Sequence, residues 1–117
     1  MARRVLIVDD TMESRYMLTA LLSHCDCLVS AAESGQEALD LACGFKPQTV
    51  FLDIKMPEMD GYELAKRLRS ESGLNAAKIV AISGLDCDVT KLKDAGIDSY
   101  LRKPVMLHSL QRALETQ

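Results

Sequence analysis

Two hydrophobic patterns alternate along the chain. Short, nearly continuous apolar runs predict buried strands at residues 5–8, 27–29, 49–53, 79–82 and 99–102. Between them, apolar residues recur every three or four positions, which predicts helices at residues 11–24, 34–45, 61–68, 88–95 and 107–114. In the first of these helices the buried stripe is predicted to consist of Met17, Leu18, Leu21 and Leu22. Ser34 and Glu37 fit a capping box, and Gly96 lies where a glycine commonly ends a helix. Strand and helix therefore alternate five times.

The strand segments are apolar at successive positions, so both faces of the sheet are expected to be buried. This pattern predicts an α/β fold, with a doubly wound parallel sheet between two layers of helices. In such a sheet, ligands bind at the carboxyl ends of the strands, where the strand order reverses. No repeat, linker or low-complexity tract interrupts the pattern, so residues 1–117 are predicted to form one domain.

Composition and charge exclude several classes of protein. A chain of 117 residues with 48% hydrophobic and 26% charged residues is typical of a soluble globular domain. The net charge of −3 argues against a nucleic-acid partner, which requires a concentrated basic patch. No apolar run approaches the roughly 18 residues that span a membrane. Arg3-Arg4 precedes an apolar run too short for a signal peptide, so a cytoplasmic location is expected.

In that compartment the cysteines are expected to be thiols that pack against apolar neighbours, not metal ligands or redox pairs. They are Cys25, Cys27, Cys43 and Cys87. His24 and His108 lie in amphipathic segments and are expected on helix surfaces.

Chemically active side chains follow four of the predicted strands. Asp9 and Asp10 follow the first strand, Asp53 ends the third, Ser83 follows the fourth and Lys103 follows the fifth. Each residue alone has an ordinary interpretation as a helix cap, a turn residue or a solvated charge. Because the carboxyl ends of parallel strands lie at one edge of the sheet, we expect all five side chains to share a pocket.

Three ionised carboxylates in one pocket repel one another, so either some of them take up protons or a cation joins them. A site of oxygen ligands without His or Cys suits Mg²⁺. Lys103 adds a positive charge, which is useful there only if an anion binds between it and the metal, and Ser83 offers that anion a hydrogen-bond donor. The simplest such anion is a phosphoryl group carried covalently on Asp53.

These residues resemble the receiver domains of two-component response regulators, the CheY-like family. The matching motifs are Val8-Asp9-Asp10, Asp53-x-x-Met56-Pro57-x-Met59-Asp60-Gly61, Ser83-Gly84 and Lys103-Pro104. The resemblance extends over essentially the whole chain. It implies a three-layer fold with strand order 2-1-3-4-5 and a cis peptide before Pro104.

The resemblance also implies roles for the acidic residues. Asp53 would accept a phosphoryl group from the histidine of a sensor histidine kinase or a histidine phosphotransfer protein. Asp10, Asp53 and the backbone carbonyl of Lys55 would bind Mg²⁺ directly, and Asp9 would act mainly through water.

The remaining roles concern the phosphate and the signal. Ser83 and Lys103 would bind the phosphate, and Tyr100 would be the aromatic switch that turns inward as Ser83 moves. The domain would signal to an unknown downstream protein through protein contacts. It would not be an enzyme, although it would assist its own phosphorylation and dephosphorylation.

Three features depart from the family pattern. Ser83 replaces the commoner threonine, and Lys55 places a positive side chain at the pocket mouth, where it could slow phosphate loss or contact a partner. Residues 85–96 form a short segment, so the fourth helix is expected to have only about two turns. This brevity puts the family's usual signalling face, from the fourth helix to the fifth, in question.

Other functions are less consistent with the residues. An aspartyl-phosphate phosphatase needs a second acid two residues after its nucleophile, where this chain has Lys55. A flavodoxin-like electron carrier needs a first loop that cradles a flavin phosphate, which Asp9 and Asp10 would repel. The intact pocket argues against a degenerate receiver that serves only as a scaffold. The chain is expected to be a free-standing regulator or the receiver of a hybrid histidine kinase, which Lys103-Pro104-Val105 weakly favours.

Overall fold

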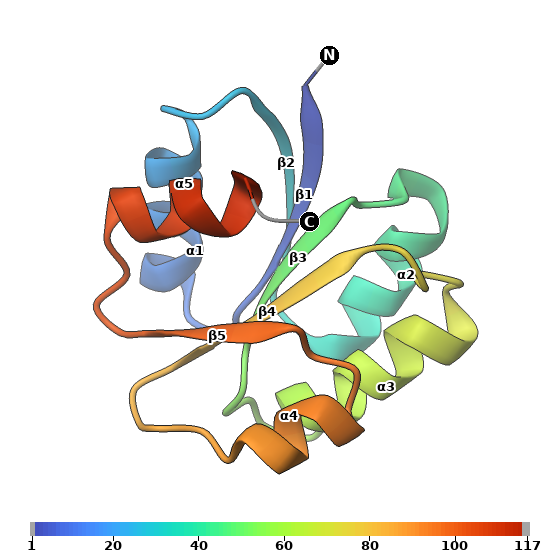
Figure 1. The fold of residues 1–117 in the computed structure, drawn as a ribbon. Helices are drawn as coiled ribbons and strands as arrows, with labels where there is room; N and C mark the ends of the chain where they lie inside the picture. The colour runs from blue at the N-terminus through green and yellow to red at the C-terminus, as the bar shows by residue number, and fades with distance from the viewer. Residues whose placement is uncertain (1, 116–117) are drawn as a thin grey trace.

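In the computed structural model, which describes residues 2–115, five strands and five helices alternate along the chain (Figure 1). The strands are β1 (Arg3–Val8), β2 (Cys27–Ala32), β3 (Thr49–Asp53), β4 (Lys78–Ser83) and β5 (Ser99–Arg102). The helices are α1 (Met12–Leu22), α2 (Gly35–Phe45), α3 (Gly61–Glu71), α4 (Val89–Asp94) and α5 (Leu107–Glu115). The strands form one parallel sheet in the order β2-β1-β3-β4-β5. The predicted fold class and strand order are confirmed.

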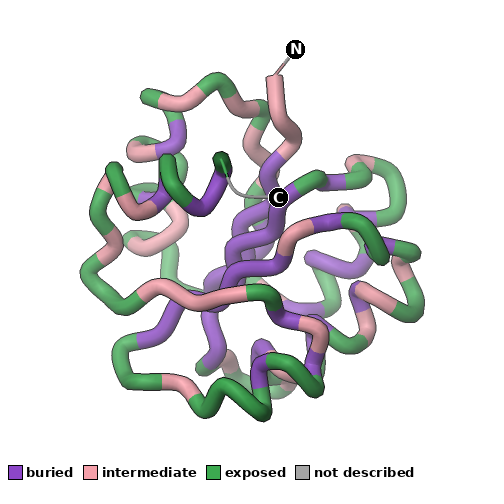
Figure 2. Tube along the Cα trace, in the orientation of Figure 1, coloured by how far each residue is buried: buried purple, intermediate pink, exposed green. Residues whose placement is uncertain are grey.

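The sheet is covered on both faces, by α1 and α5 on one side and by α2, α3 and α4 on the other (Figure 1). Val5 and Ile7 belong to the apolar cluster beneath α1 and α5, whereas Leu6 and Val8 belong to the cluster beneath the other three helices. All four are at most 1% exposed. Successive side chains of a strand point to opposite faces, so the continuous apolar runs in the sequence reflect burial on both. Figure 2 shows the three central strands, β1, β3 and β4, as the buried centre of the molecule.

The second strand is longer than its sequence pattern predicts. β2 continues to Ala32, three residues past the predicted end, because its pairing with β1 persists as far as the Val8–Ala32 pair. It lies at the edge of the sheet, where Leu28 remains 57% exposed. The edge position explains why its hydrophobic signal is weak.

The helices α1 and α4 can be compared with their predicted buried face and length. In α1, Leu18 and Leu22 are buried but Met17 is 57% exposed, so the assignment of Met17 to the buried stripe is wrong. α4 has only six residues, as the short segment predicted. It begins after Asp88, whose carboxylate accepts a hydrogen bond from the Thr90 N–H.

The capping box predicted for α2 forms with a different partner. The Ser34 hydroxyl accepts the Glu37 N–H at 3.1 Å, as expected of an N-cap. The Glu37 carboxylate, however, accepts the N–H of Glu33 at 2.7 Å, one residue before the cap. The predicted C-terminal glycine after α4 is confirmed, since Gly96 adopts a φ of 81°.

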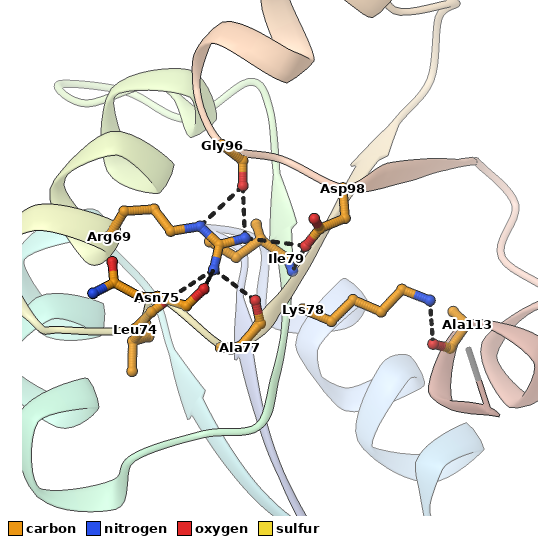
Figure 3. A network of polar contacts seen from close by, with 9 residues as sticks. All are labelled: Arg69, Leu74, Asn75, Ala77, Lys78, Ile79, Gly96, Asp98 and Ala113. Atoms are coloured by element: carbon orange, nitrogen blue, oxygen red, sulfur yellow. Dashed lines mark hydrogen bonds and ion pairs between the residues drawn. The ribbon is translucent and has the colours of Figure 1, made fainter. Parts of the chain in front are cut away.

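The segments that lead into β4 and β5, at the end of the strands away from the predicted pocket, are held by Arg69 in the last turn of α3 (Figure 3). Its guanidinium donates to the Gly96 carbonyl at 2.7 and 3.1 Å and to the Ala77 carbonyl at 2.6 Å, and it lies 3.0 Å from Asp98. Asp98 accepts the Ile79 N–H at 2.8 Å. Arg69 also donates to the carbonyls of Leu74 and Asn75. These bonds fix the segments that enter β4 and β5.

The cysteines are free thiols in different environments. Cys25, Cys27 and Cys87 are half-buried and pack against the apolar clusters, as predicted. Cys43 is exposed, so the packing prediction is wrong for this residue because it lies on the outer face of α2. His108 is exposed on α5, as predicted, whereas His24 is exposed but lies two residues beyond the end of α1. Within residues 2–115, every helix is too short or too polar to cross a membrane.

Candidate functional site

Three carboxylates meet at the carboxyl edge of the sheet. Asp9 and Asp10 directly follow β1, and Asp53 is the last residue of β3, which pairs with β1. Carboxylate oxygens of the three residues lie within 4.8 Å of one another. Asp9 and Asp53 are only 1% and 7% exposed, whereas Asp10 is exposed. The pairing of the two central strands therefore brings together acids that are 43 positions apart in sequence (Asp10 to Asp53).

Lys103 supplies a positive charge to the same pocket. Its ammonium lies 3.3 Å from Asp53 Oδ2. The lysine follows β5, and its backbone N–H donates to the Ser83 carbonyl at 2.8 Å, which extends the β4–β5 pairing to this residue. The Lys103–Pro104 peptide is cis, as the resemblance implied.

Without a cation, the three carboxylates of the pocket repel one another. Burial raises the pKa of Asp9, and the negative charges of Asp53 and Asp10 raise it further. The Thr11 N–H bond to Asp9 and the charge of Lys103 act in the opposite direction, without cancelling the rise in pKa. A divalent cation bound by the three carboxylates would neutralise this excess negative charge. The all-oxygen donor set fits Mg²⁺.

The loop after Asp53 is tightly folded. The Lys55 N–H donates to Asp53 Oδ1 at 3.1 Å, and the Gly61 N–H donates to the Ile54 carbonyl at 2.8 Å. A Cβ at Gly61 would lie 2.8 Å from both the Asp53 carbonyl oxygen and the Ile54 Cα, so only glycine fits without displacement. Asp60 caps α3 by accepting the Glu63 N–H at 2.9 Å. The side chain of Lys55 is exposed.

Ser83 lies at the end of β4 with its hydroxyl engaged in a local turn. It is 8% exposed, donates to the Leu85 carbonyl at 2.8 Å and accepts the Leu85 N–H at 3.1 Å. The hydroxyl is therefore committed to the β4–α4 loop in this structure. Tyr100 is half-buried in β5, pairs with Ala81 and packs against the apolar cluster beneath α2, α3 and α4.

Two polar contacts near the pocket were not anticipated from the sequence. Arg15 of α1 donates to the backbone carbonyl of Asp9 at 2.7 Å. Arg102 pairs with Asp86 at 2.6 Å and so connects the end of β5 to the β4–α4 loop. The contact of Arg15 could have been predicted, because side chains in the first turn of a helix point toward the loop that precedes the helix. The pairing of Arg102 with Asp86 could not be predicted, because no sequence pattern links these two residues.

The comparisons with known proteins agree with this geometry. The family profile described as "Response regulator receiver domain" matches residues 5–115. The chain belongs to this family. Receiver domains of this CheY-like type are signalling domains of two-component systems.

The receiver is similar to proteins of different sizes. It is 38% identical over 109 residues to response regulator MprA of Mycolicibacterium vanbaalenii, covering 92% of this chain and 46% of that protein. The chain thus spans about half the length of such relatives. It is 33% identical to protein PilH of Pseudomonas aeruginosa, covering 95% of this chain and 93% of PilH. It is also 36% identical to hybrid signal transduction histidine kinase A of Dictyostelium discoideum, covering 96% of this chain and 6% of the kinase.

Solved structures share the whole fold. The chemotaxis protein CheY4 of Vibrio cholerae aligns with a TM-score of 0.93 at 27% identity, over 98% of both chains. A second similar structure is the co-crystal of the Saccharomyces cerevisiae histidine phosphotransfer protein Ypd1 with the receiver domain of Ssk1. It aligns with a TM-score of 0.84 at 28% identity, over 95% of this chain and 85% of that one.

Proposed function

We propose that this receiver is a Mg²⁺-dependent phosphoacceptor in which Asp53 takes a phosphoryl group from a phosphohistidine. The donor would be a sensor histidine kinase or a histidine phosphotransfer protein. The observation that carries the proposal is the convergence of three carboxylates within 4.8 Å, with the Lys103 ammonium 3.3 Å from one of them. An acidic pocket with an added lysine is suited to an anion that arrives together with a divalent cation.

The transfer breaks the N–P bond of the phosphohistidine and forms a P–O bond to an Asp53 carboxylate oxygen. The electron pair of the broken bond stays on the histidine nitrogen. Asp10, Asp53 and the Lys55 carbonyl would hold Mg²⁺, with Asp9 acting through water. The metal supplies charge neutralisation for the phosphoryl oxygens. Lys103, already 3.3 Å from Asp53 Oδ2, would pair with the oxygens of the transferred group.

The signal would start at Ser83. For its hydroxyl to bind the phosphoryl group, it must release the Leu85 carbonyl, which it now contacts at 2.8 Å. The β4–α4 loop would change conformation as a result, and Tyr100 on the adjacent strand would turn inward. The changed surface, which includes the exposed Leu85 and Val89, would contact a downstream protein.

The donor is proposed to dock against α1. Met12, Tyr16 and Met17 are 73%, 78% and 57% exposed on this helix. A small apolar groove between α1 and the segment after β5 opens beside the pocket and is lined in part by Met17 and Pro104. An apolar helical surface of a histidine-bearing partner would cover these side chains and bring its histidine to Asp53. The similarity to the Ssk1 receiver, crystallised with Ypd1, supports this class of partner.

Two assemblies remain compatible with the proposal. PilH, of which the chain covers 93%, supports a free-standing regulator, and the Dictyostelium hybrid kinase supports a receiver within a larger kinase. A cytoplasmic site of action follows from the proposed kinase partner in either case.

The test is phosphate incorporation from acetyl phosphate with and without Mg²⁺, measured on intact protein by mass spectrometry. Wild type should incorporate one phosphoryl group only when Mg²⁺ is present, and Asp53→Asn should incorporate none. Asp40→Asn, which changes an exposed carboxylate on α2, is the matched control and should behave as wild type. Absence of incorporation into wild type from acetyl phosphate and from phosphorylated histidine donors would refute the proposal.

A further inference from the structure

We propose that Arg15 is a positioning residue for the Mg²⁺ site, because it fixes the loop that carries Asp9 and Asp10 from behind. This inference rests on the proposed function, since it concerns the affinity of the same pocket. Arg15 is the fourth residue of α1 and shares a helical face with the buried Leu18 and Leu22. Its side chain is only 18% exposed, in contrast to its neighbour Tyr16, which is 78% exposed.

The guanidinium holds the loop through a backbone group. One of its nitrogens, Nη1, donates to the Asp9 carbonyl oxygen at 2.7 Å, and the other, Nη2, lies 3.7 Å from a Glu33 carboxylate oxygen. Glu33 directly follows β2, the strand that pairs with β1. Arg15 therefore joins three segments: the first helix, the loop after β1 and the end of β2.

Asp9 is fixed at three points, of which Arg15 supplies one. Its N–H donates to the Ala32 carbonyl at 3.1 Å, its carboxylate accepts the Thr11 N–H at 2.8 Å, and its carbonyl accepts from Arg15. The Asp9–Asp10 and Asp10–Thr11 peptides thus lie between anchored groups. The backbone of Asp10, the exposed acid of the trio, is placed by these anchors.

The need for an anchor follows from the charge of the pocket. Asp10 lies within 4.8 Å of two other carboxylates, so without a cation the repulsion pushes its loop outward. Mg²⁺ accepts little deviation from octahedral geometry at short metal–oxygen distances. A loop held in place before the ion arrives loses less conformational entropy on binding, which favours a lower Kd. Arg15 acts on this geometry without touching the ion or the phosphoryl group.

The experiment measures the Kd for Mg²⁺ by isothermal titration calorimetry on the full chain, with unfolding by urea in EDTA as a second readout. Arg15→Gln should raise the Kd about tenfold, the low end of the effect of residues that orient metal ligands. Arg15→Lys keeps the charge but has one ammonium in place of the two-pronged guanidinium, so its Kd should lie between those of wild type and Arg15→Gln. Glu33→Gln should change the Kd less than twofold, since the Asp9 contact is retained and an exposed ion pair contributes little.

Two controls separate positioning from charge and from general stability. Arg67→Gln removes a positive charge from α3, where Arg67 pairs with Glu71, and should leave the Kd unchanged. Arg69→Met should destabilise the fold from the opposite edge of the sheet and also leave the Kd unchanged. A Kd for Arg15→Gln no higher than that of Arg67→Gln would overturn the inference.

The remaining outcomes also decide the question. If Arg15→Gln does not fold by circular dichroism, Arg15→Lys carries the test, and a Kd equal to that of wild type overturns the inference. A wild-type chain that binds no Mg²⁺ would instead overturn the proposed function itself. Wild-type binding combined with equal binding by Arg15→Gln would leave the proposed function standing.

Discussion

Replacing Asp9 by Asn should stabilise the metal-free protein. The substitution removes one of three negative charges that lie within 4.8 Å of one another, while the amide oxygen can still accept the Thr11 N–H now bound at 2.8 Å. A compensating charge, the Lys103 ammonium, lies 3.3 Å from Asp53 Oδ2. The wild-type pocket is therefore arranged for a cation, and in EDTA its repulsion opposes folding.

The magnitude can be derived from the geometry. Two unit charges 4.8 Å apart repel by about 3 kcal/mol at an effective dielectric constant of about 20, and by about 1 kcal/mol in water. Asp9 is buried but Asp10 is exposed, and the variant also loses attraction to Lys103. We expect a net gain of about 1 kcal/mol in the free energy of unfolding at pH 7, or about 4 °C in Tm for a domain of this size.

The gain should depend on pH in a defined direction. Burial, followed by the charges of Asp53 and Asp10, raises the pKa of Asp9 above its ordinary value of 3.8. The folded state then binds a proton more readily than the unfolded chain. Asp9 therefore destabilises the fold fully at pH values above its raised pKa, and this penalty disappears as the pH falls below 3.8. The advantage of Asp9→Asn should shrink between pH 7 and pH 4.

The assay is urea unfolding followed by circular dichroism in EDTA at both pH values, repeated at pH 7 with saturating Mg²⁺. Mg²⁺ should stabilise wild type more than the variant, because a ligand that binds the folded state stabilises it by an amount that rises with the logarithm of its affinity. A variant less stable than wild type in EDTA at pH 7, or an advantage that grows in acid, would refute the reasoning.

Further predictions concern the scaffold and the loop. Arg69→Met should lower the free energy of unfolding by about 3 kcal/mol, because it removes the donor shared by the part-buried carbonyls of Gly96 and Ala77 and breaks the ion pair with Asp98. Arg67→Met, which removes the pair with Glu71 on the same helix, should leave the urea midpoint nearly unchanged, and equal effects of the two would contradict this account. Gly61→Ala should cost about 2 kcal/mol or more in the same assay, because its Cβ would lie 2.8 Å from the Asp53 carbonyl oxygen; unchanged stability would show that the loop can relax.

The fold could be predicted because strands and helices each have their own spacing of apolar residues in the sequence. The apolar runs of β1 and β3 are buried on both faces, and this is the property that marks a parallel sheet. β2 was predicted too short because an edge strand needs fewer apolar residues. Met17 was assigned to the buried stripe of α1 because helical spacing alone does not fix the width of a buried face.

The candidate site could be predicted from the sequence for a different reason. Asp53 and Ser83 end their strands, whereas Asp9, Asp10 and Lys103 come just after theirs, and the parallel topology places all these strand ends at one edge of the sheet. The convergence of the three carboxylates and Lys103 followed from the fold, whereas the roles of all five residues as phosphate acceptor, ligands and switch rest on the family resemblance and remain predictions.

The supporting contacts could not be predicted in the same way. The bonds of Arg69 go to backbone carbonyls, and any residue type can supply these, so no motif marks the partners. The turn between Ser83 and Leu85 depends on a hydroxyl rotamer that several sequences would allow. The exposure of Cys43 depends on how α2 is rotated against the sheet.

The most direct test of the central claim is to locate the phosphoryl group chemically. The protein is incubated with acetyl phosphate and Mg²⁺, treated with borohydride, which reduces an acyl phosphate to an alcohol, and digested for mass spectrometry. We predict homoserine at position 53, absent when Mg²⁺ is withheld or Asp53→Asn is used. Reduction at another carboxylate, or equal reduction at Asp53 in EDTA, would contradict the account.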